Sequence, residues 1–275
     1  MKIILSRKGF DCVNGGCPSP ILPDGTMLSI PIPSYDNDRY DDLAYKDISY
    51  SELIKGLNPA FSYTNCHLDP DIREDVRRIK NPDWKPAFGQ CDSAQGMLSN
   101  AGVENGDLFL FFGWFKKTHL KDGIYHFNTR KNSGDFYDFA DLHVIYGYMQ
   151  IEKILAGKDQ IKEYYWHPHV INNLPENRNN VLYIPAERLS FCPGMKGYGT
   201  FDFSKKRVLT KEGKTRASWN KFSFLEPEHL YGKRKNSAKI NSDGKQDVLY
   251  YGGIWQELIV YESPEIIEWI KDIIK

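Results

Sequence analysis

An uninterrupted apolar run, LFLFFGWF at residues 108–115, constrains the fold of this chain more than any other feature. The run is too short to span a membrane, and the turn-forming residues at 103–107 mark where it begins. Short apolar runs bounded by turn signals are typical of strands in a protein core, so it predicts a buried strand. A second predicted strand at 143–152 carries Gly147 between apolar residues, and together the two strands predict the wall of a small barrel.

The wider pattern predicts an α+β fold. The two strands resemble those of PUA-like and EVE-like domains, which hold modified bases, but a plain β-meander gives the same pattern. We expect a single domain over residues 1–275, with a mixed or antiparallel sheet, a PUA-like partial barrel at about 103–185, short flanking helices and a C-terminal helix. Ser263 and Pro264 are the N-cap and first-turn proline of that last helix. Other strands are predicted at 2–6, 26–32, 181–185 and 256–261, and other helices begin at Ser49 and near Asp92.

Charge and cysteine content exclude several classes of function. Lys plus Arg and Asp plus Glu both number 36, so the formal net charge is zero. This balance argues against wholesale, non-specific nucleic-acid binding, which requires a strongly positive field. The five cysteines form no CxxC pair and no signal-peptide pattern precedes them. We therefore expect a cytoplasmic protein with reduced thiols and no membrane partner.

The first predicted strand leads directly into charged residues and glycines. Arg7, Lys8 and Asp11 follow it, and a loop with Gly15 and Gly16 comes next. Active sites are often built on such loops, because a rigid sheet holds them in place. Arg7 and Lys8 are candidates to bind phosphate, the first as a bidentate donor and the second as a point charge. An ion pair between Arg7 and Asp11 that pins the loop is the structural alternative.

Two further segments are rich in histidine and carboxylate. His67, Asp69 and Asp71 alternate, so in an extended segment their side chains face the same way and can hold a divalent cation. The alternative is an Asx-type turn followed by the N-cap of a helix near residue 72. His167 and His169 can bind a metal or a phosphate together, or can be loop histidines with satisfied hydrogen bonds.

Two loops give weaker indications of a ligand. The glycine-spaced loop at 192–199 carries Lys196 but lacks the Gly-Lys-Ser/Thr pattern of a P-loop. The segment 232–247 is basic and polar, which is typical of a mobile loop and can also contact a phosphate backbone.

Several blocks of the sequence resemble the nucleotide modification associated domain family, third type. The similar blocks are SRKGFD at the first strand, GGCPSP at 15–20, SIPIP at 29–33, GDLFLFFGWF at 106–115 and GYMQ at 147–150, together with the pair at 167–168 and the segment 185–219. The resemblance covers most of the chain. It implies a bacterial or phage protein associated with enzymes that make or use modified nucleobases, which gives a class of ligand but no reaction.

With this resemblance, the candidate residues predict a protein that binds a nucleotide or modified base and acts on it. Asp11 and Asp24 would hold a divalent ion or act as general base, and His143 and His167 would transfer protons. Trp114 or Tyr148 would stack on the base. The candidate ligand-binding residues are Arg7, Lys8, Gly15, Gly16, Gln90, Trp114, Tyr148, His169 and Lys196.

Two other functions fit the same sequence, so whether the chain is an enzyme stays open. One is a module without chemistry that recognises a modified base in DNA or sequesters a nucleotide signal. The other is a protein-interaction component of a phage or defence assembly. The cofactor is not identified by the sequence, although a divalent metal fits the candidate residues.

Overall fold

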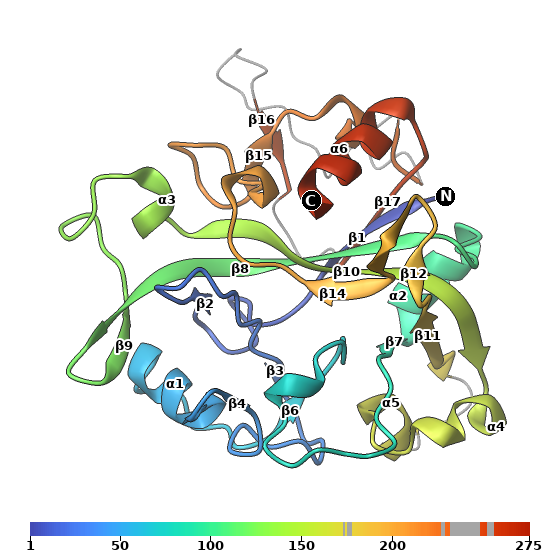
Figure 1. Cartoon of the computed structure of the whole chain (residues 1–275), viewed down its shortest axis with the longest axis horizontal. Coiled ribbons are helices and arrows are strands. Elements are labelled where there is room, and N and C mark those ends of the chain that lie inside the picture. The colour runs from blue at the N-terminus through green and yellow to red at the C-terminus, as the bar shows by residue number, and fades with distance from the viewer. Residues whose placement is uncertain (173, 175–177, 227–228, 232–247, 252–255) are drawn as a thin grey trace.

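The computed structural model describes residues 1–172, 174, 178–226, 229–231, 248–251 and 256–275 (Figure 1). The main sheet is formed by β1 (Ile3–Arg7), β2 (Ser19–Ile21), β7 (Phe88–Gln90), β8 (Leu108–Lys121), β9 (Ile124–Phe127), β10 (Leu142–Ala156), β11 (Val181–Pro185), β14 (Tyr198–Thr200) and β17 (Glu257–Val260). Four two-stranded pairs are β3 (Ile32–Pro33) with β6 (Cys66–His67), β4 (Ala44–Tyr45) with β5 (Ile48–Ser49), β12 (Arg188–Leu189) with β13 (Cys192–Lys196), and β15 (Ser218–Asn220) with β16 (Val248–Tyr250). The α-helices are α1 (Tyr50–Leu57), α2 (Asp92–Asn100), α3 (Phe136–Phe139), α4 (Lys158–Ile161), α5 (Pro168–Ile171) and α6 (Pro264–Ile274).

The main sheet is mixed and curls into a half-barrel, which confirms the predicted fold class. Its central path runs β17-β1-β8-β10-β11-β7, while β2 and β9 also pair with β8 and β14 pairs with β10. The pairs β1–β8 and β2–β8 are parallel, and the others are antiparallel. The sheet therefore draws β1, β7 and β17 from outside the segment 103–185 in which we expected the barrel.

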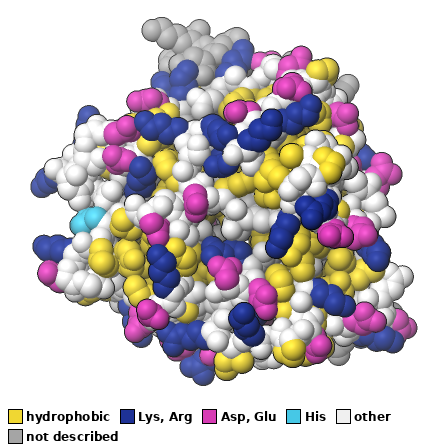
Figure 2. Space-filling view, viewed as in Figure 1, with side chains coloured by type: hydrophobic (Ala, Val, Ile, Leu, Met, Phe, Trp, Pro, Cys, Tyr) yellow, Lys and Arg dark blue, Asp and Glu magenta, His cyan; other side chains and the backbone are white. Residues whose placement is uncertain are grey.

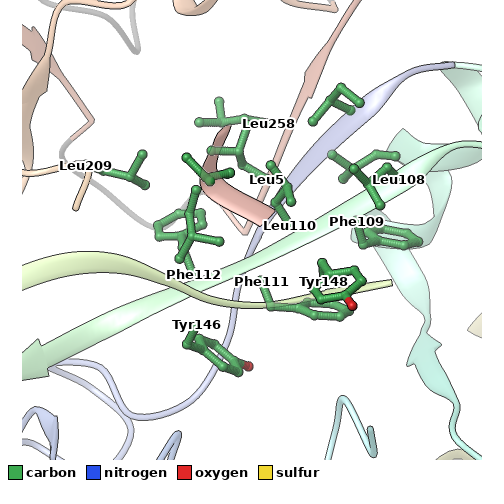
Figure 3. Close-up of a cluster of buried hydrophobic side chains, with 14 of the residues drawn as sticks. Leu5, Leu108, Phe109, Leu110, Phe111, Phe112, Tyr146, Tyr148, Leu209 and Leu258 are labelled. Carbon is green, nitrogen blue, oxygen red and sulfur yellow. The ribbon is translucent and has the colours of Figure 1, made fainter. Parts of the chain in front are cut away.

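Strand β8 forms the middle of the core because both of its faces are apolar. Leu110 and Phe112 lie on one side of the strand, and Phe109 and Phe111 lie on the other (Figure 3). All four side chains are buried, so the sheet is covered on both faces at this strand. A continuous apolar run, rather than an alternating one, is what such a doubly covered strand requires.

The curl of the sheet originates in the long strand β10. Its first part, as far as Gln150, pairs with β8, and its last part, from Ile151 to Ala156, pairs with β11. The register shifts between Ile145 and Gly147 and again near Ile151. Such irregularities bend a strand and increase its twist, so one strand can belong to both walls of the half-barrel.

Different elements pack on the two faces of the sheet. Helix α6 lies over one face and buries Ile266, Ile270 and Ile273 in the main core (Figure 1). On the opposite side lie α1, β4 and β6, where a second apolar cluster forms among residues 10–76. Ser49 and Glu52 form the predicted capping box at the start of α1. None of the described helices is long and apolar enough to cross a membrane.

Two local predictions were wrong. The segment 26–32 was expected to be a strand, but only Ile32 belongs to one, in β3. Leu28 and Ile30 are nevertheless buried, because the segment packs in the second cluster without a regular ladder. The helix expected near residue 72 is a single 3-10 turn at Glu74–Val76. The basic segment 232–247 lies outside the described residues.

Candidate functional site

A cavity of about 240 Å³ opens where the ends of several elements meet. β1 ends at Arg7, β6 at His67 and β7 at Gln90, and α5 contributes His169. The chain leaves β1 through Gly9, whose φ of 79° is a conformation that glycine adopts without steric cost. Residues 7, 8 and 11, at the carboxyl end of the first strand, therefore line a cavity.

Arg7 and Lys8 line the cavity, as does Arg178, whose guanidinium is paired with Asp92. The Lys8 side chain is largely buried, with Nζ 3.7 Å from Oε1 of Glu257 and 4.4 Å from the centre of the Phe88 ring. Burial lowers the pKa of Arg7, and the nearby charge of Asp11 opposes that shift. The cavity thus presents two cations held in place by the sheet, an arrangement suited to an anionic group.

Glu257, the first residue of β17, places a carboxylate beside the Lys8 ammonium. Its side chain is buried, and Oε1 accepts hydrogen bonds from the Ser6 hydroxyl at 3.0 Å and from the Gln90 amide at 2.7 Å. Burial raises the pKa of Glu257, while the charge of Lys8 lowers it. Gln90 therefore lines the cavity as predicted, but one of its amide hydrogens is engaged in the wall. Sequence reasoning missed Glu257, although a carboxylate in an apolar strand was a usable signal.

His67, Asp69 and His169 converge on the same cavity. One ligand atom from each lies within 4.8 Å of the others, and His169 Nε2 is 4.0 Å from Asp69 Oδ2. The sequence predicted that His67 and Asp69 face the same way, and it proposed His169 separately. It gave no reason to join the two segments, which are about 100 residues apart.

Hydrogen bonds fix the protonation of both rings. His67 Nδ1 lies 2.5 Å from Oδ2 of Asp36, an acceptor, so Nδ1 carries the proton. His169 Nδ1 lies 2.7 Å from Oδ1 of Asn180, whose amide nitrogen donates to the His169 carbonyl oxygen and so fixes the amide orientation. In the neutral form of each ring the lone pair is therefore on Nε2. Burial lowers the pKa of His67, but the hydrogen bond to Asp36 and the charge of Asp69 raise it above its usual value. Burial lowers the pKa of His169 to about 4, which keeps that ring neutral.

Asp69 is held in place from two sides. Its Oδ1 accepts a hydrogen bond from the Gly89 amide at 2.7 Å and lies 3.4 Å from Nε2 of His167. His167 Nδ1 accepts the backbone N–H of His169, while its buried Nε2 makes no hydrogen bond among the described residues. Burial alone would raise the pKa of Asp69, but His167, His169 and Lys8 together hold it well below its usual range. His167 thus contacts the carboxylate.

Asp71, the third member of the alternating set, is directed elsewhere. It is fully buried and accepts hydrogen bonds from Arg77 Nη1 at 2.9 Å and from the Trp84 indole at 3.0 Å. Of the three residues that the sequence proposed for a cation, two therefore face the cavity and one stabilises the fold.

Asp11 caps the loop that follows it. Its Oδ1 accepts the backbone N–H groups of Val13 and Asn14 at 2.8 and 2.7 Å. Gly15 and Gly16 have φ values of 94° and 70°, and the Gly16 amide donates to the Asp11 carbonyl. The glycines thus complete a turn that Asp11 organises, while Asp11 itself lines the cavity and the two glycines are not among its lining residues.

A second cavity of about 170 Å³ shares Arg7 and Asp11 with the first. It is also lined by Trp114 and His143. The Arg216 guanidinium lies 4.0 Å from the centre of the Trp114 ring. This cavity therefore places a predicted stacking residue and a predicted proton-transfer residue next to the basic wall of the first cavity.

The structure places three predicted residues away from both cavities. Asp24 caps its own turn and contacts the Lys46 ammonium at 3.0 Å. Tyr148 is buried against Phe201, and its hydroxyl donates to the Lys196 carbonyl at 3.1 Å. None of Asp24, Tyr148 and Lys196 is among the residues lining either cavity.

The family described as nucleotide modification associated domain 3 matches residues 2–260 of the 275 in the chain. The chain belongs to this family. The match confirms the resemblance found in the sequence, and it extends from β1 to β17, so it includes every residue of the two cavities. Comparisons with curated proteins and with solved structures found no match.

The description of the nucleotide modification associated domain 3 family links this chain to nucleotide modification and fits a nucleotide or base as partner. Sequence reasoning missed three polar residues that lie at the cavity or support it: Asp36, Asn180 and Arg178. They come from irregular segments, and only the fold brings them near the histidines.

We expect the stability of this nucleotide modification associated domain to depend on pH through the buried ring of His143. Burial, followed by the charges of Arg216 and Arg7, lowers the pKa of His143 to about 3, and its Nδ1 accepts a hydrogen bond from the Trp219 indole. Between pH 6.5 and 3 the unfolded chain binds a proton at this residue that the folded chain does not. The stability that this residue contributes is therefore complete above pH 6.5 and is lost progressively as the pH falls.

Urea unfolding at a series of pH values measures this effect. His143→Gln keeps a hydrogen-bond acceptor but does not titrate, so its stability should decline less than that of the unmodified protein below pH 6.5. Equal slopes for the two proteins would contradict the prediction.

Proposed function

We propose that this protein binds a nucleotide or a modified nucleobase in the cavity at the end of β1 and acts on it there. The observation that carries the proposal is the placement of Arg7 and Lys8 in one cavity wall, opposite histidine and carboxylate side chains. Cations bind phosphate, and histidine and carboxylate groups are the commonest proton-transfer groups in enzymes. A site that only recognises a ligand would not require proton-transfer groups opposite the cations.

The two neighbouring cavities suggest how a nucleotide would lie. The first is lined by Arg7 and Lys8, which suit a phosphate. The second is lined by Phe10, Trp114 and Tyr251, with Arg216 over the indole, and planar aromatic and guanidinium groups stack on bases. Arg7 lines both cavities and would contact the ligand where phosphate and base join.

The charge distribution favours a small ligand over a long duplex. On the face drawn in Figure 2, Lys and Arg side chains are interspersed with Asp and Glu instead of forming a basic stripe. The formal net charge is zero. Binding of a duplex backbone relies on many cations on one face, whereas one nucleotide needs only a few.

A binding series with nucleotides, nucleosides and short DNA tests the proposal. A ligand at 100 times its dissociation constant should add about 2.7 kcal/mol to the free energy of unfolding, which a thermal-shift assay detects. Arg7→Gln should weaken nucleotide binding about 10–100-fold, because a charge-assisted hydrogen bond contributes roughly 1.5–3 kcal/mol. Arg39→Gln is the matched control, since Arg39 is exposed and paired with Asp41 away from the cavity.

Each outcome of this series has a distinct meaning. Nucleotide binding that is lost in Arg7→Gln and retained in Arg39→Gln supports the proposed site, and conversion of the bound compound supports an enzyme. Binding without conversion favours a module that recognises a modified base or sequesters a nucleotide. Binding of DNA alone, with equal affinity in both variants, would overturn the proposal.

A further inference from the structure

We propose that His67, Asp69 and His169 form a binding site for one divalent first-row transition metal ion. The site lies in the wall of the cavity described above, but the inference goes beyond the proposed function and holds whether or not the ligand is a nucleotide. It rests on the convergence of three ligand atoms, on the orientation of the two rings and on the space that a glycine leaves for one of them.

The three ligand atoms are close to a coordinating arrangement. They lie within 4.8 Å of one another, and all three residues line the cavity. Zinc bound to nitrogen and oxygen at 2.0–2.2 Å holds neighbouring ligands about 3.4 Å apart in a tetrahedral site. The largest of these distances therefore has to shorten by about 1.4 Å, the difference between 4.8 Å and about 3.4 Å, and the His67 side chain at this site is 24% exposed.

The hydrogen bonds of the two rings are those of metal-ligating histidines. Such histidines donate their other ring N–H to a carboxylate or a carbonyl oxygen, which fixes the tautomer and the ring direction. Here Asp36 and the Asn180 amide oxygen play that part for His67 and His169. Among the described residues, neither Nε2 atom makes a hydrogen bond, although His169 is only 4% exposed.

The absence of a side chain at Gly89 leaves space for the ring of His169. A Cβ at this position would lie 2.3 Å from Cδ2 and 2.7 Å from Nε2 of His169, so any larger residue would displace the ring. The same glycine donates its amide hydrogen to Asp69 Oδ1 and leaves Oδ2 for the site. His167 contacts that Oδ1 from the other side at 3.4 Å. One backbone position thus serves two of the three ligands.

The ligand types select the class of ion. Imidazole nitrogens suit zinc, iron, nickel and copper, whereas Mg²⁺ and Ca²⁺ prefer oxygen ligands throughout. Three protein ligands leave coordination positions open, which is typical of catalytic rather than structural zinc sites. Because all three residues line the cavity, the open positions would face the space in which the ligand binds.

Zinc binding to the purified protein tests the inference. After removal of metal and dialysis against Zn²⁺, we expect one tightly bound ion per chain by elemental analysis, and a saturable binding isotherm by calorimetry. His67→Gln and Asp69→Asn should each weaken zinc binding by more than 100-fold. Asp36→Asn should weaken it about 10–100-fold, because its effect is exerted through His67.

The chain offers a matched control in a second pair of histidines. The rings of His119 and His126 lie 5.9 Å apart on β8 and β9, and the described residues place no carboxylate with them in a group of three potential metal ligands. The variant His119→Gln/His126→Gln should bind zinc like the unmodified protein. Circular dichroism and unfolding in the absence of metal show whether each variant is folded.

Two outcomes would overturn the inference. One is weak, multiple zinc binding, and the other is binding that survives in folded His67→Gln and Asp69→Asn variants. Zinc binding is measured without nucleotide, and nucleotide binding is measured with and without zinc. Failure of the metal site and failure of the proposed function are therefore distinguishable.

Discussion

Replacing Lys8 by Met is expected to destabilise the protein by about 3–5 kcal/mol, since removal of one partner of a buried ion pair leaves a buried charge uncompensated. The remaining charge is Glu257, which is buried, 3.7 Å from the Lys8 ammonium, and keeps one carboxylate oxygen without a hydrogen bond within the described part of the chain. Urea unfolding of the variant measures the loss.

The stability lost in Lys8→Met should increase as the pH rises. Burial already raises the pKa of Glu257, and removal of Lys8 raises it further. A carboxyl group with a raised pKa retains its proton in the folded state, so stability declines as the pH rises above the unfolded value near 4.3. Lys8→Met should therefore be more destabilised at pH 8 than at pH 5.

A double variant provides the control. In Lys8→Met/Glu257→Gln both charges of this pair are removed, and the Gln oxygen can still accept from Ser6 and Gln90. Most of the lost stability should return, because buried ion pairs can be replaced by neutral groups at little cost. Losses that simply add would show that Lys8 and Glu257 do not interact. Since Lys8 supports the fold, Arg7 is the better probe of ligand binding.

The second large effect is expected at the centre of the sheet. Phe111 is fully buried in β8, near Phe109 (Figure 3). The centroid of its ring lies 5.2 Å from that of Phe88 and 5.9 Å from that of Phe109. Phe111→Ala removes these contacts and leaves a cavity, which typically costs about 3–5 kcal/mol. Chemical and thermal unfolding should both show the loss.

Leu120→Ala on the same strand is the matched control, because Leu120 is 54% exposed. A surface change of this kind should alter the free energy of unfolding by less than about 0.5 kcal/mol. Comparable losses in the two variants would mean that β8 is not the core strand described above.

The parts of the fold that could be predicted from the sequence are those with local signals. The apolar run of β8, the start of α6 at Ser263 and the capping box at Ser49 each involve residues close together in the chain. The segment 26–32 has the same local pattern as a strand. It failed as a prediction because its backbone groups make hydrogen bonds outside a regular ladder, such as Phe10 N to the Ile30 carbonyl and Ile30 N to the Ser19 hydroxyl.

The candidate site was only half predictable for the same reason. Arg7, Lys8 and Asp11 follow one strand, and His67 and Asp69 share one extended segment, so spacing alone grouped each set. The approach of His169 to Asp69, and of Glu257 to Lys8, depends on sheet order, which local patterns do not encode. Asp24 illustrates a different limit of local patterns. Its carboxylate suggested a metal ligand or a general base, whereas in the fold it accepts the Thr26 amide hydrogen and closes a turn.

The position of β1 between β8 and β17 has a consequence for how the protein is made. The neighbours of Ile3 in the sheet are Leu108 and Val260, so both partners of the first strand lie far away in the chain. A ribosome that adds about 5–20 residues per second completes β17 many seconds after β1 has emerged. Until then the backbone of β1 lacks one neighbour and Lys8 lacks Glu257. The cavity can therefore assemble only after β17 and Gln256, which lines it, have been made, and the nascent chain cannot bind the ligand before then.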